Sequence, residues 1–171
     1  KMKTAYSIGH SNHPLEEFLR LLQANLIRYL IDIRSVPYSK FHPQYNQESL
    51  KAALDKECIQ YVFLGNQLGG RITNPVCYKN HEIPKTTAGY ATFLEYDVIK
   101  TQKFFLLGIQ KLHALIDMGT CAIMCSEENP DTCHRELILG RKLKEDGFSL
   151  IHIRAKKDAS PQLSLFEQAN E

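Results

Sequence analysis

The segment between Cys125 and Arg135 carries the side chains that could most directly do chemistry. It reads CSEENPDTCHR and supplies two cysteines, a histidine, an arginine and two glutamates. Cysteine and histidine can ligate zinc, a thiolate can act as a nucleophile, and an arginine can bind a phosphate or carboxylate through parallel hydrogen bonds. A metal site, a nucleophilic site and an anion-binding site are therefore the three alternatives.

The metal site is the weakest of these alternatives. Cys121 and Cys125 fall within one expected strand, where four residues separate them by roughly 13 Å, whereas zinc needs its ligands about 2.0 to 2.3 Å from one point. Cys133 and His134 are sequence neighbours that would diverge on a helix. We therefore predict no metal and no other cofactor.

A nucleophilic site has better support. Asn129 followed by Pro130 is typical of a helix start, which places Cys133 in or just after the first turn. There the helix dipole and nearby cations would favour a thiolate. Alternatively, Cys133 begins a buried stripe that continues through Leu137 and Gly140 at helical spacing. The spacing alone slightly favours the second interpretation.

An anion-binding site would use the free backbone N–H groups at the same helix start, with Arg34 and Arg135 as forked donors. The alternative is that these arginines only brace the structure, through an ion pair between Arg34 and Glu127 or between Asp32 and Arg135. The sequence does not decide between the two.

Strands and helices alternate along the chain, which predicts the elements that must position these residues. Each expected strand is a short apolar run bounded by turn residues, and each helix shows 3.6-residue periodicity. The expected strands cover residues 4–9, 29–35, 61–70, 120–127 and 148–154, and the expected helices cover 14–25, 46–59, 90–99, 102–118 and 130–147. This order predicts a three-layer α/β/α fold with a mostly parallel, Rossmann-like sheet of about five strands.

The bulk properties suit one compact domain. The chain has 171 residues, with 43% hydrophobic and 23% charged residues and a net charge of only +2, so charge alone does not indicate a nucleic-acid-binding protein. We expect a single α/β domain over residues 1–154, with 71–90 as an excursion outside the core, and a flexible tail over 155–171. Five cysteines, an odd number, suggest reduced thiols. With no apolar stretch of roughly 18 residues, we expect a cytoplasmic protein without a membrane partner.

This architecture predicts where a site can lie. In open parallel sheets, ligands bind beyond the carboxyl ends of the strands. The expected strands end in the segments 9–11, 32–35, 64–65 and 125–127, so four separated stretches should meet at one rim.

Several motifs together resemble a known family. SIGHS at 7–11, DIRSVPYSKF at 32–41, LGNQLGG at 64–70 and CSEENPDTCHR at 125–135 resemble the DUF488 family, over roughly residues 4–153. That family is a group of prokaryotic proteins without an assigned reaction. The resemblance marks as candidate site residues Gly9, His10, Ser11, Asp32, Arg34, Pro37, Ser39, Gly65, Cys125, Glu127, Cys133, His134 and Arg135.

Two classes of function follow. The first is a nucleic-acid-associated protein, an accessory to DNA repair or replication, that binds DNA or a nucleotide at the rim. The loop PYSKFHPQYNQ, residues 37–47, has the aromatic and basic mixture that stacks bases and follows a phosphate backbone, although it could simply cover the sheet end. The second is an enzyme acting on a phosphate-bearing small molecule.

The enzyme alternative assigns roles within the rim. Cys133 or His134 acts on the ligand, and Glu127 or Asp32 orients the histidine. Because we expect the rim to be exposed, Arg135→Ala and His134→Ala should remove function without much loss of stability. The other rim residues are expected to bind the ligand; they are Gly9, His10, Ser11, Arg34, Ser39, Gly65, Cys125 and Arg135.

The tail contains a second short motif, QLSLF at residues 162–166. It resembles the pentapeptide by which many bacterial replication and repair proteins dock on the sliding clamp. Leu163, Leu165 and Phe166 could insert into an apolar groove while Gln162 forms hydrogen bonds at its edge. The alternative is that this segment folds back on the domain.

We predict that a fluorescent peptide covering residues 158–171 binds the purified bacterial sliding clamp. Leu165→Ala and Phe166→Ala should each weaken binding, because both apolar anchors would leave the groove. Fluorescence titration measures the dissociation constant. Binding weaker than about millimolar, or binding that neither substitution changes, would remove the tail as an argument for a DNA context.

Overall fold

A parallel five-stranded sheet forms the centre of the molecule. The computed structural model describes residues 2–87 and 89–156. All neighbouring strands run parallel, in the order β3-β2-β4-β1-β5. The strands are β1 (Lys3–Gly9), β2 (Tyr29–Asp32), β3 (Gln60–Phe63), β4 (Cys121–Cys125) and β5 (Phe148–Ile153).

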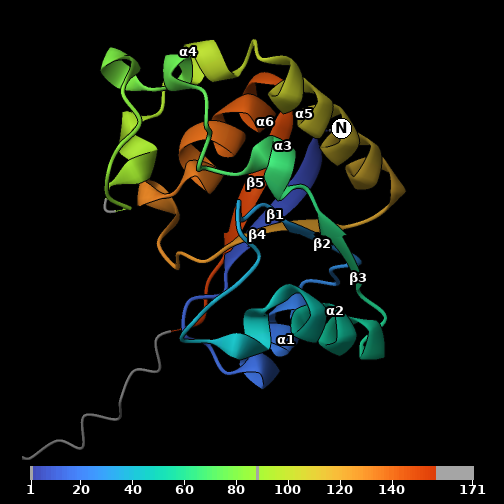
Figure 1. Ribbon diagram of the computed structural model, residues 1–171. Coiled ribbons are helices and arrows are strands. Elements are labelled where there is room, and N and C mark those ends of the chain that lie inside the picture. Colours follow the sequence, from blue (N-terminus) through green and yellow to red (C-terminus); the bar gives the residue numbers. More distant parts are fainter. Residues whose placement is uncertain (1, 88, 157–171) are drawn as a thin grey trace, which may run out of the picture.

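Helices cover both faces of this sheet (Figure 1). On one face lie α1 (Leu15–Ala24) and α2 (Gln47–Lys56), and on the other lie α3 (Gly65–Leu68), α5 (Lys103–Met118) and α6 (Arg141–Glu145). The short helix α4 (Tyr96–Ile99) lies on the same side as α5. The predicted three-layer α/β/α fold with a parallel, Rossmann-like sheet is confirmed.

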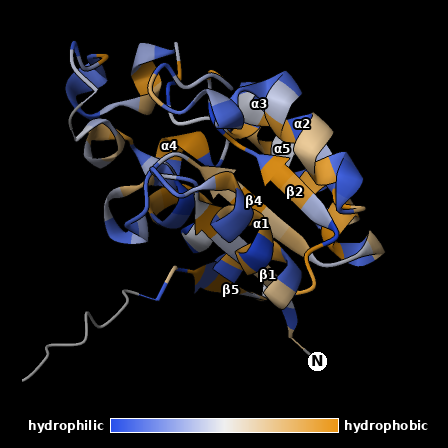
Figure 2. Cartoon of the chain, turned by 90° about the horizontal axis from the view of Figure 1, so that it is seen from below, coloured by the Kyte–Doolittle hydropathy of each residue, from blue (hydrophilic) through white to orange (hydrophobic). Residues whose placement is uncertain are grey.

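The alternation of side chains along each strand divides the core into two parts. In β2, Leu30 packs with Phe18 of α1 and Leu50 of α2, whereas its neighbour Ile31 packs with Phe105 of α5. Successive strand residues point to opposite faces, so a strand covered on both sides must be apolar throughout. Figure 2 shows the resulting hydrophobic colouring of β2 and β4 between the helices.

The strand order creates a crevice at the carboxyl end of β4. The chain leaves β1 and β2 towards helices α1 and α2 on one face, whereas it leaves β4, which lies between them, towards α6 on the opposite face. Such a change of face opens a space beyond the strand ends where ligands bind. Gly9 of β1 and Cys125 of β4 are register partners at this point.

One strand and two helices differ from the sequence-based prediction. The third strand ends at Phe63, because Gly65 begins α3; a Cβ on Gly65 would lie 1.9 Å from the Arg34 carbonyl oxygen, so the chain turns where only glycine fits. The helix expected over 90–99 is a 3-10 turn, Tyr90–Phe93, followed by the separate helix α4. The interruption is the extended backbone at Leu94 and Glu95.

The helix expected over 130–147 also begins later than predicted. Residues Pro130–Thr132 form an isolated 3-10 turn, in which the Asn129 side chain accepts a hydrogen bond from the Asp131 N–H. Cys133 then has an extended backbone, with φ −105° and ψ 143°. A π-helical segment, Arg135–Gly140, leads into α6. Cys133 therefore precedes the helix instead of lying within its first turn.

The segment 71–90 adds no strand to the sheet, but part of it enters the core. Cys77 and Tyr78 are fully buried in the cluster that contains Phe105, which differs from the expected excursion outside the core. The division into a domain over 1–154 and a tail over 155–171 stays a prediction, because residues 157–171 lie outside the described residues. Among the described residues, none of the helices combines the length and apolar composition that crossing a bilayer requires.

Candidate functional site

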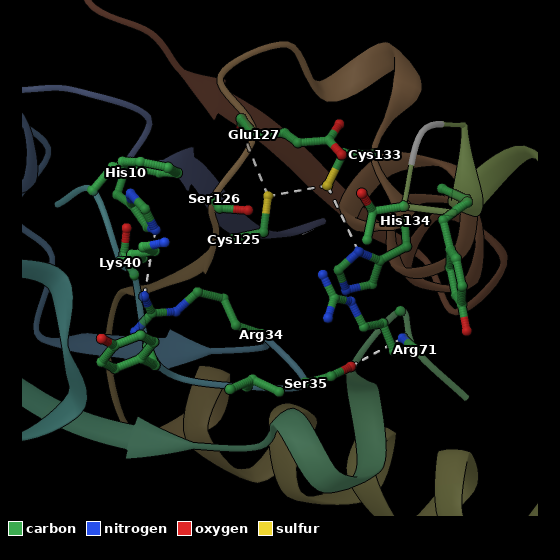
Figure 3. Close-up of a pocket in the computed structure, with 18 residues that line it drawn as sticks. His10, Arg34, Ser35, Lys40, Arg71, Cys125, Ser126, Glu127, Cys133 and His134 are labelled. Atoms are coloured by element: carbon green, nitrogen blue, oxygen red, sulfur yellow. Dashed lines mark hydrogen bonds between the residues drawn. The ribbon is translucent and has the colours of Figure 1, made fainter. Parts of the chain in front are cut away.

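A cavity of about 610 Å³ opens at the carboxyl ends of β1, β2 and β4 (Figure 3). The residues expected from the sequence fall into two groups around it. Seven line the cavity: His10, Arg34, Ser39, Cys125, Glu127, Cys133 and His134. The others lie outside that lining: Gly9, Ser11, Asp32, Pro37, Gly65 and Arg135.

Two of the residues outside the lining shape the cavity through close packing. A Cβ on Gly9 would lie 1.8 Å from the Glu127 carbonyl oxygen, so only glycine lets β1 approach the loop after β4. The Ser11 N–H donates to the Ser126 carbonyl at 2.9 Å and holds the same loop from the other side.

Two reduced cysteines face each other inside the cavity. The Sγ atoms of Cys125 and Cys133 lie 3.0 Å apart, and the side chains point towards one another in Figure 3. Cys125 is 3% exposed and Cys133 is 2% exposed. Access to either sulfur is therefore through the cavity.

The Arg135 guanidinium lies directly behind this pair. Arg135 is 0% exposed, and its Nη1 donates to the Cys125 Sγ at 2.6 Å, its Nε to the Ser7 Oγ at 3.0 Å and its Nη2 to the Glu128 carbonyl at 3.1 Å. Within the described residues, none of the ion pairs includes Arg135. Of these three partners, only the Cys125 thiol can ionise to balance the buried charge.

The two cysteines consequently have opposite pKa shifts. Burial opposes ionisation of Cys125, but the hydrogen bond with Cys133 and the charge of Arg135 outweigh it, so the pKa of Cys125 is lowered. The hydrogen bond with Cys125, together with burial, raises the pKa of Cys133 far above that of an ordinary thiol. This arrangement favours a Cys125 thiolate that accepts a hydrogen bond from the Cys133 thiol.

The prediction of a Cys133 thiolate, one of two alternatives for this residue, is not favoured by this arrangement. It assumed that Cys133 lies at a helix start, where the dipole would favour negative charge. Cys133 does lie at the helix start, where its carbonyl accepts hydrogen bonds from the Glu136 and Leu137 N–H groups, but the Arg135 guanidinium binds Cys125 instead. Cys125, which we expected only to bind the ligand, has the environment of a nucleophile.

Asp32 and Arg34 bind each other. Arg34 donates from Nε to one Asp32 carboxylate oxygen at 2.9 Å and from Nη2 to the other at 2.7 Å, and the Tyr61 hydroxyl donates to the same carboxylate at 2.6 Å. Asp32 is fully buried. We expected Asp32 to orient a histidine or to pair with Arg135, and expected Arg34 to pair with Glu127; neither ion pair is found in the described part of the chain.

Glu127 does not reach a histidine either. Its carboxylate lies near the Thr132 hydroxyl, at 3.4 Å, while its backbone carbonyl accepts a hydrogen bond from the Arg135 Nη1. The Glu127 side chain is exposed and lines the cavity. No contact therefore supports the prediction that the Glu127 side chain orients a histidine. Glu127 contributes to the site through its backbone carbonyl, which binds Arg135.

Both cavity histidines are neutral near pH 7. The His10 Nδ1 lies 2.9 Å from the Ser11 carbonyl, to which it can donate only as N–H, and this leaves Nε2 as the acceptor facing the Arg34 Nη1 at 3.4 Å. The Nδ1 of His134 lies 3.7 Å from the Cys133 Sγ. Burial lowers the pKa of each histidine to about 4.

A chain of hydrogen bonds behind Arg135 was not predicted. Because the Ser7 oxygen accepts from Arg135, its hydroxyl can donate to the His152 Nδ1, and the His152 Nε2 then donates to Glu136 at 2.7 Å. These residues come from β1, β5 and the π-helical segment. Ser7 lies within the SIGHS motif, but no sequence signal marked His152 or Glu136.

The cavity wall has more positive than negative side chains. Arg34, Lys40 and Arg71 line it, against Glu127 as the acidic residue of the lining. Arg71 was not predicted. Its backbone N–H donates to the Ser35 hydroxyl oxygen at 2.9 Å, and this bond holds the segment around Arg71 against the end of β2. The excess of cationic groups favours an anionic ligand. Within the described residues, no group of three or more His, Cys, Asp or Glu side chains could hold a metal ion.

The family model described as "Domain of unknown function DUF488" matches residues 14–141. The chain belongs to the DUF488 family. The matched span includes both cysteines, Arg34 and Arg135, whereas the strand end with His10 precedes it. No curated protein and no solved structure matches the chain. The family assignment expected from the motifs is thus confirmed for this DUF488 protein, and it names no reaction.

Burial also corrects an expectation about stability. Arg135→Ala was expected to leave the stability nearly unchanged because the rim was thought to be exposed. Since Arg135 is fully buried and hydrogen-bonded on several sides, its removal creates a cavity and leaves Ser7 and the loop carbonyls without their donor. Arg135 therefore contributes to the fold as well as to the site.

We predict that acid weakens the fold through the two cavity histidines. Their pKa is about 4 in the folded protein against 6.5 ordinarily, so between these values the unfolded chain binds more protons. The neutral histidines contribute fully to the free energy of unfolding above pH 6.5. This contribution is lost as the pH falls to 4, and for His10 the loss is up to about 3 kcal/mol. Urea unfolding at several pH values measures this slope.

The histidine contribution is isolated with two variants. His10→Asn should reduce the slope between pH 6.5 and 4 by about half, because His134 still contributes. His81→Asn, a change at an exposed histidine outside the cavity lining, should leave the slope as in the natural chain. Equal slopes in all three proteins would show that His10 is not held neutral by burial.

Proposed function

We propose that this DUF488 protein is a cysteine-dependent enzyme in which the Cys125 thiolate attacks an anionic ligand bound in the cavity. The observation that carries the proposal is the fully buried guanidinium of Arg135, whose Nη1 lies 2.6 Å from the Cys125 Sγ. An arginine stays protonated in proteins, and a buried charge without a counter-ion is strongly destabilising. A thiolate at Cys125 supplies the counter-ion.

This arrangement does not require a general base for Cys125. The thiolate is the reactive form of cysteine, and cationic neighbours favour it. Other thiol enzymes use a histidine to take the proton, but here the neutral His10 and His134 do not contact the Cys125 Sγ; the hydrogen bond of His134 goes to Cys133. Arg135 therefore acts as the positioning residue that keeps Cys125 ionised.

The cationic lining supports an anionic ligand. The Arg34 Nη1 is free of the Asp32 carboxylate, which binds the Nε and Nη2 of the same guanidinium. Lys40 and Arg71 lie across the opening from each other in Figure 3. A phosphate or carboxylate group could bind between these groups while its electrophilic atom approaches Cys125.

The covalent step can be written with balanced electrons. The electron pair on the Cys125 sulfur forms a bond to the electrophilic atom of the ligand, and the bond from that atom to its leaving group breaks. The leaving group departs with the second electron pair and takes a proton from water. The product of this step is a covalent adduct on Cys125.

We predict that Cys125 is alkylated by iodoacetamide at a lower pH than a free thiol, because its pKa is lowered. The pH at which the alkylation rate is half-maximal should lie clearly below about 8.5. Peptide mass spectrometry after brief labelling identifies the modified residue, and Cys58→Ser removes the exposed cysteine from the background. Preferential labelling of Cys133, or a midpoint at or above pH 8.5, would count against the proposal.

The charge of the reagent tests the lining. The ratio of the alkylation rate with negatively charged iodoacetate to the rate with neutral iodoacetamide should be higher at Cys125 than for a free thiol. Arg71→Gln should lower this ratio at Cys125, whereas Lys56→Gln, which removes an exposed charge on α2, should not. An unchanged ratio in the Arg71 variant would exclude Arg71 from anion binding.

A second candidate function, binding of nucleotides or single-stranded nucleic acid, is supported by the loop after β2. Tyr38 and Phe41 line the cavity yet are 62% and 80% exposed, and Lys40 lies between them in sequence. Exposed aromatic rings beside a cation are the arrangement on which bases stack. A role beside DNA repair or replication would also use the motif at 162–166, which lies outside the described residues.

We predict that Tyr38→Ala and Phe41→Ala each weaken binding of a fluorescent single-stranded oligonucleotide at least fivefold, since one stacked base contributes about 1 to 3 kcal/mol. Fluorescence anisotropy at fixed salt measures the affinity with DNA and RNA. Phe93→Ala, at an exposed aromatic residue outside the cavity lining, is the matched control. Equal affinities for all variants would reject this function.

A further inference from the structure

We infer that Cys125 and Cys133 work as a dithiol pair that reduces the disulfide bond of a small anionic substrate. The inference rests on the proposed function, because Cys125 makes the first attack, and it adds the reaction type and the substrate class. It is carried by the 3.0 Å contact between the two sulfur atoms on the wall of a cationic cavity.

The geometry allows the pair to close. A disulfide has an S–S distance of about 2.05 Å, so the sulfur atoms must approach by roughly 1 Å. Cys125 is the last residue of β4, while Cys133 lies between a 3-10 turn and the π-helical segment with an extended backbone. The Cys133 N–H donates to the Pro130 carbonyl and the Cys133 carbonyl accepts from the Leu137 N–H, so side-chain movement has to bring the two sulfur atoms together.

The first step transfers the substrate onto Cys125. The Cys125 thiolate attacks one sulfur of the substrate disulfide, the substrate S–S bond breaks, and the other half leaves as a thiolate. The product is a mixed disulfide between the substrate and Cys125. The adduct has no negative charge on the Cys125 sulfur.

Loss of that charge activates Cys133. The adjacent Cys125 is the largest cause that holds the Cys133 proton in place, and this cause disappears when the mixed disulfide forms. The influences that favour ionisation persist, namely the Arg135 charge and the Arg135 backbone N–H, which donates to the Cys133 Sγ at 3.5 Å. His134, with Nδ1 3.7 Å from that sulfur, can accept the proton. The two thiols are thus ionised in sequence.

The second step completes a two-electron reduction. The Cys133 thiolate attacks the Cys125 sulfur, the mixed disulfide breaks, and the second half of the substrate leaves as a thiolate. The substrate gains two electrons and becomes two thiols, while the pair loses two electrons and becomes the Cys125–Cys133 disulfide. A dithiol, or two molecules of a low-molecular-weight thiol, must then reduce the pair.

Access and charge define the substrate class. Both sulfurs are almost completely buried at the wall of a cavity of about 610 Å³, a volume in the range of small-molecule sites. A disulfide within a folded protein could not approach them. Arg34, Lys40 and Arg71 favour a substrate with carboxylate or phosphate groups beside its S–S bond.

The test uses the full chain with Cys58→Ser, because Cys58 is exposed and would react by itself. The probe is 5,5′-dithiobis(2-nitrobenzoate), an aromatic disulfide with two carboxylates. The pair should release two thionitrobenzoate ions per chain within one reaction phase, and intact mass should show the loss of two hydrogens without an adduct. Cystamine, a cationic disulfide, should react at least tenfold more slowly, relative to the rates of both reagents with a free thiol.

Single-cysteine variants separate the two steps. With Cys133→Ser, or Cys133→Ala if the first variant folds poorly, one thionitrobenzoate should be released and the other should stay on Cys125. With Cys125→Ser, release should slow at least tenfold.

The failure of this inference differs from the failure of the proposed function. A stable adduct on Cys125 in the chain with both cysteines would refute the dithiol pair and leave Cys125 as the nucleophile. Lack of preference for the anionic disulfide would refute the substrate class. If Cys125 reacts with neither the disulfide nor iodoacetamide, both proposals are wrong.

Discussion

The buried guanidinium of Arg135 is the constraint on which the rest of the site depends. A charge that is 0% exposed must be hydrogen-bonded and balanced. The surrounding groups come from distant parts of the chain: Ser7 of β1, Cys125 at the end of β4, and the carbonyls of the following loop. Their positions are thus coupled to one side chain. Arg135 links the shape of the loop to the ionisation of Cys125.

This constraint explains several features of the surrounding backbone. The Glu127 and Glu128 carbonyls point towards the guanidinium, so the loop must turn its backbone inwards. Gly9 permits that turn, because a Cβ there would overlap the Glu127 carbonyl. Ser7 fixes the direction of the hydrogen bonds that continue to His152 and Glu136. Packing and charge therefore specify the same loop conformation.

The position of this assembly follows from the topology. β4 lies between β1 and β2 and sends its chain to the opposite face, so the end of β4 opens into the crevice. Each neighbouring strand end contributes a different part of the wall: His10 after β1, and Arg34, held by Asp32, after β2. Thiol chemistry at Cys125 and anion binding at the rim thus meet within one cavity.

Local patterns in the sequence determined much of this protein. Apolar runs and helical periodicity predicted five strands and a parallel three-layer fold, because these signals depend on neighbouring residues. The motifs also predicted that the strand ends carry the candidate site. The Asp32–Arg34 pair, two residues apart, is a contact of that local kind, although we expected other partners for both residues.

Only the tertiary structure decided which cysteine has the environment of a nucleophile. The sequence offered Cys133 either as a nucleophile at a helix start or as a buried residue, but the pKa of a thiol depends on the charges around it in space. The decisive contacts join residues far apart in the chain, such as Ser7 with Arg135 and Ser7 with His152. Strand order and burial create these contacts, and a linear pattern contains neither. For that reason, the sequence located the rim, whereas the fold placed Arg135 behind Cys125.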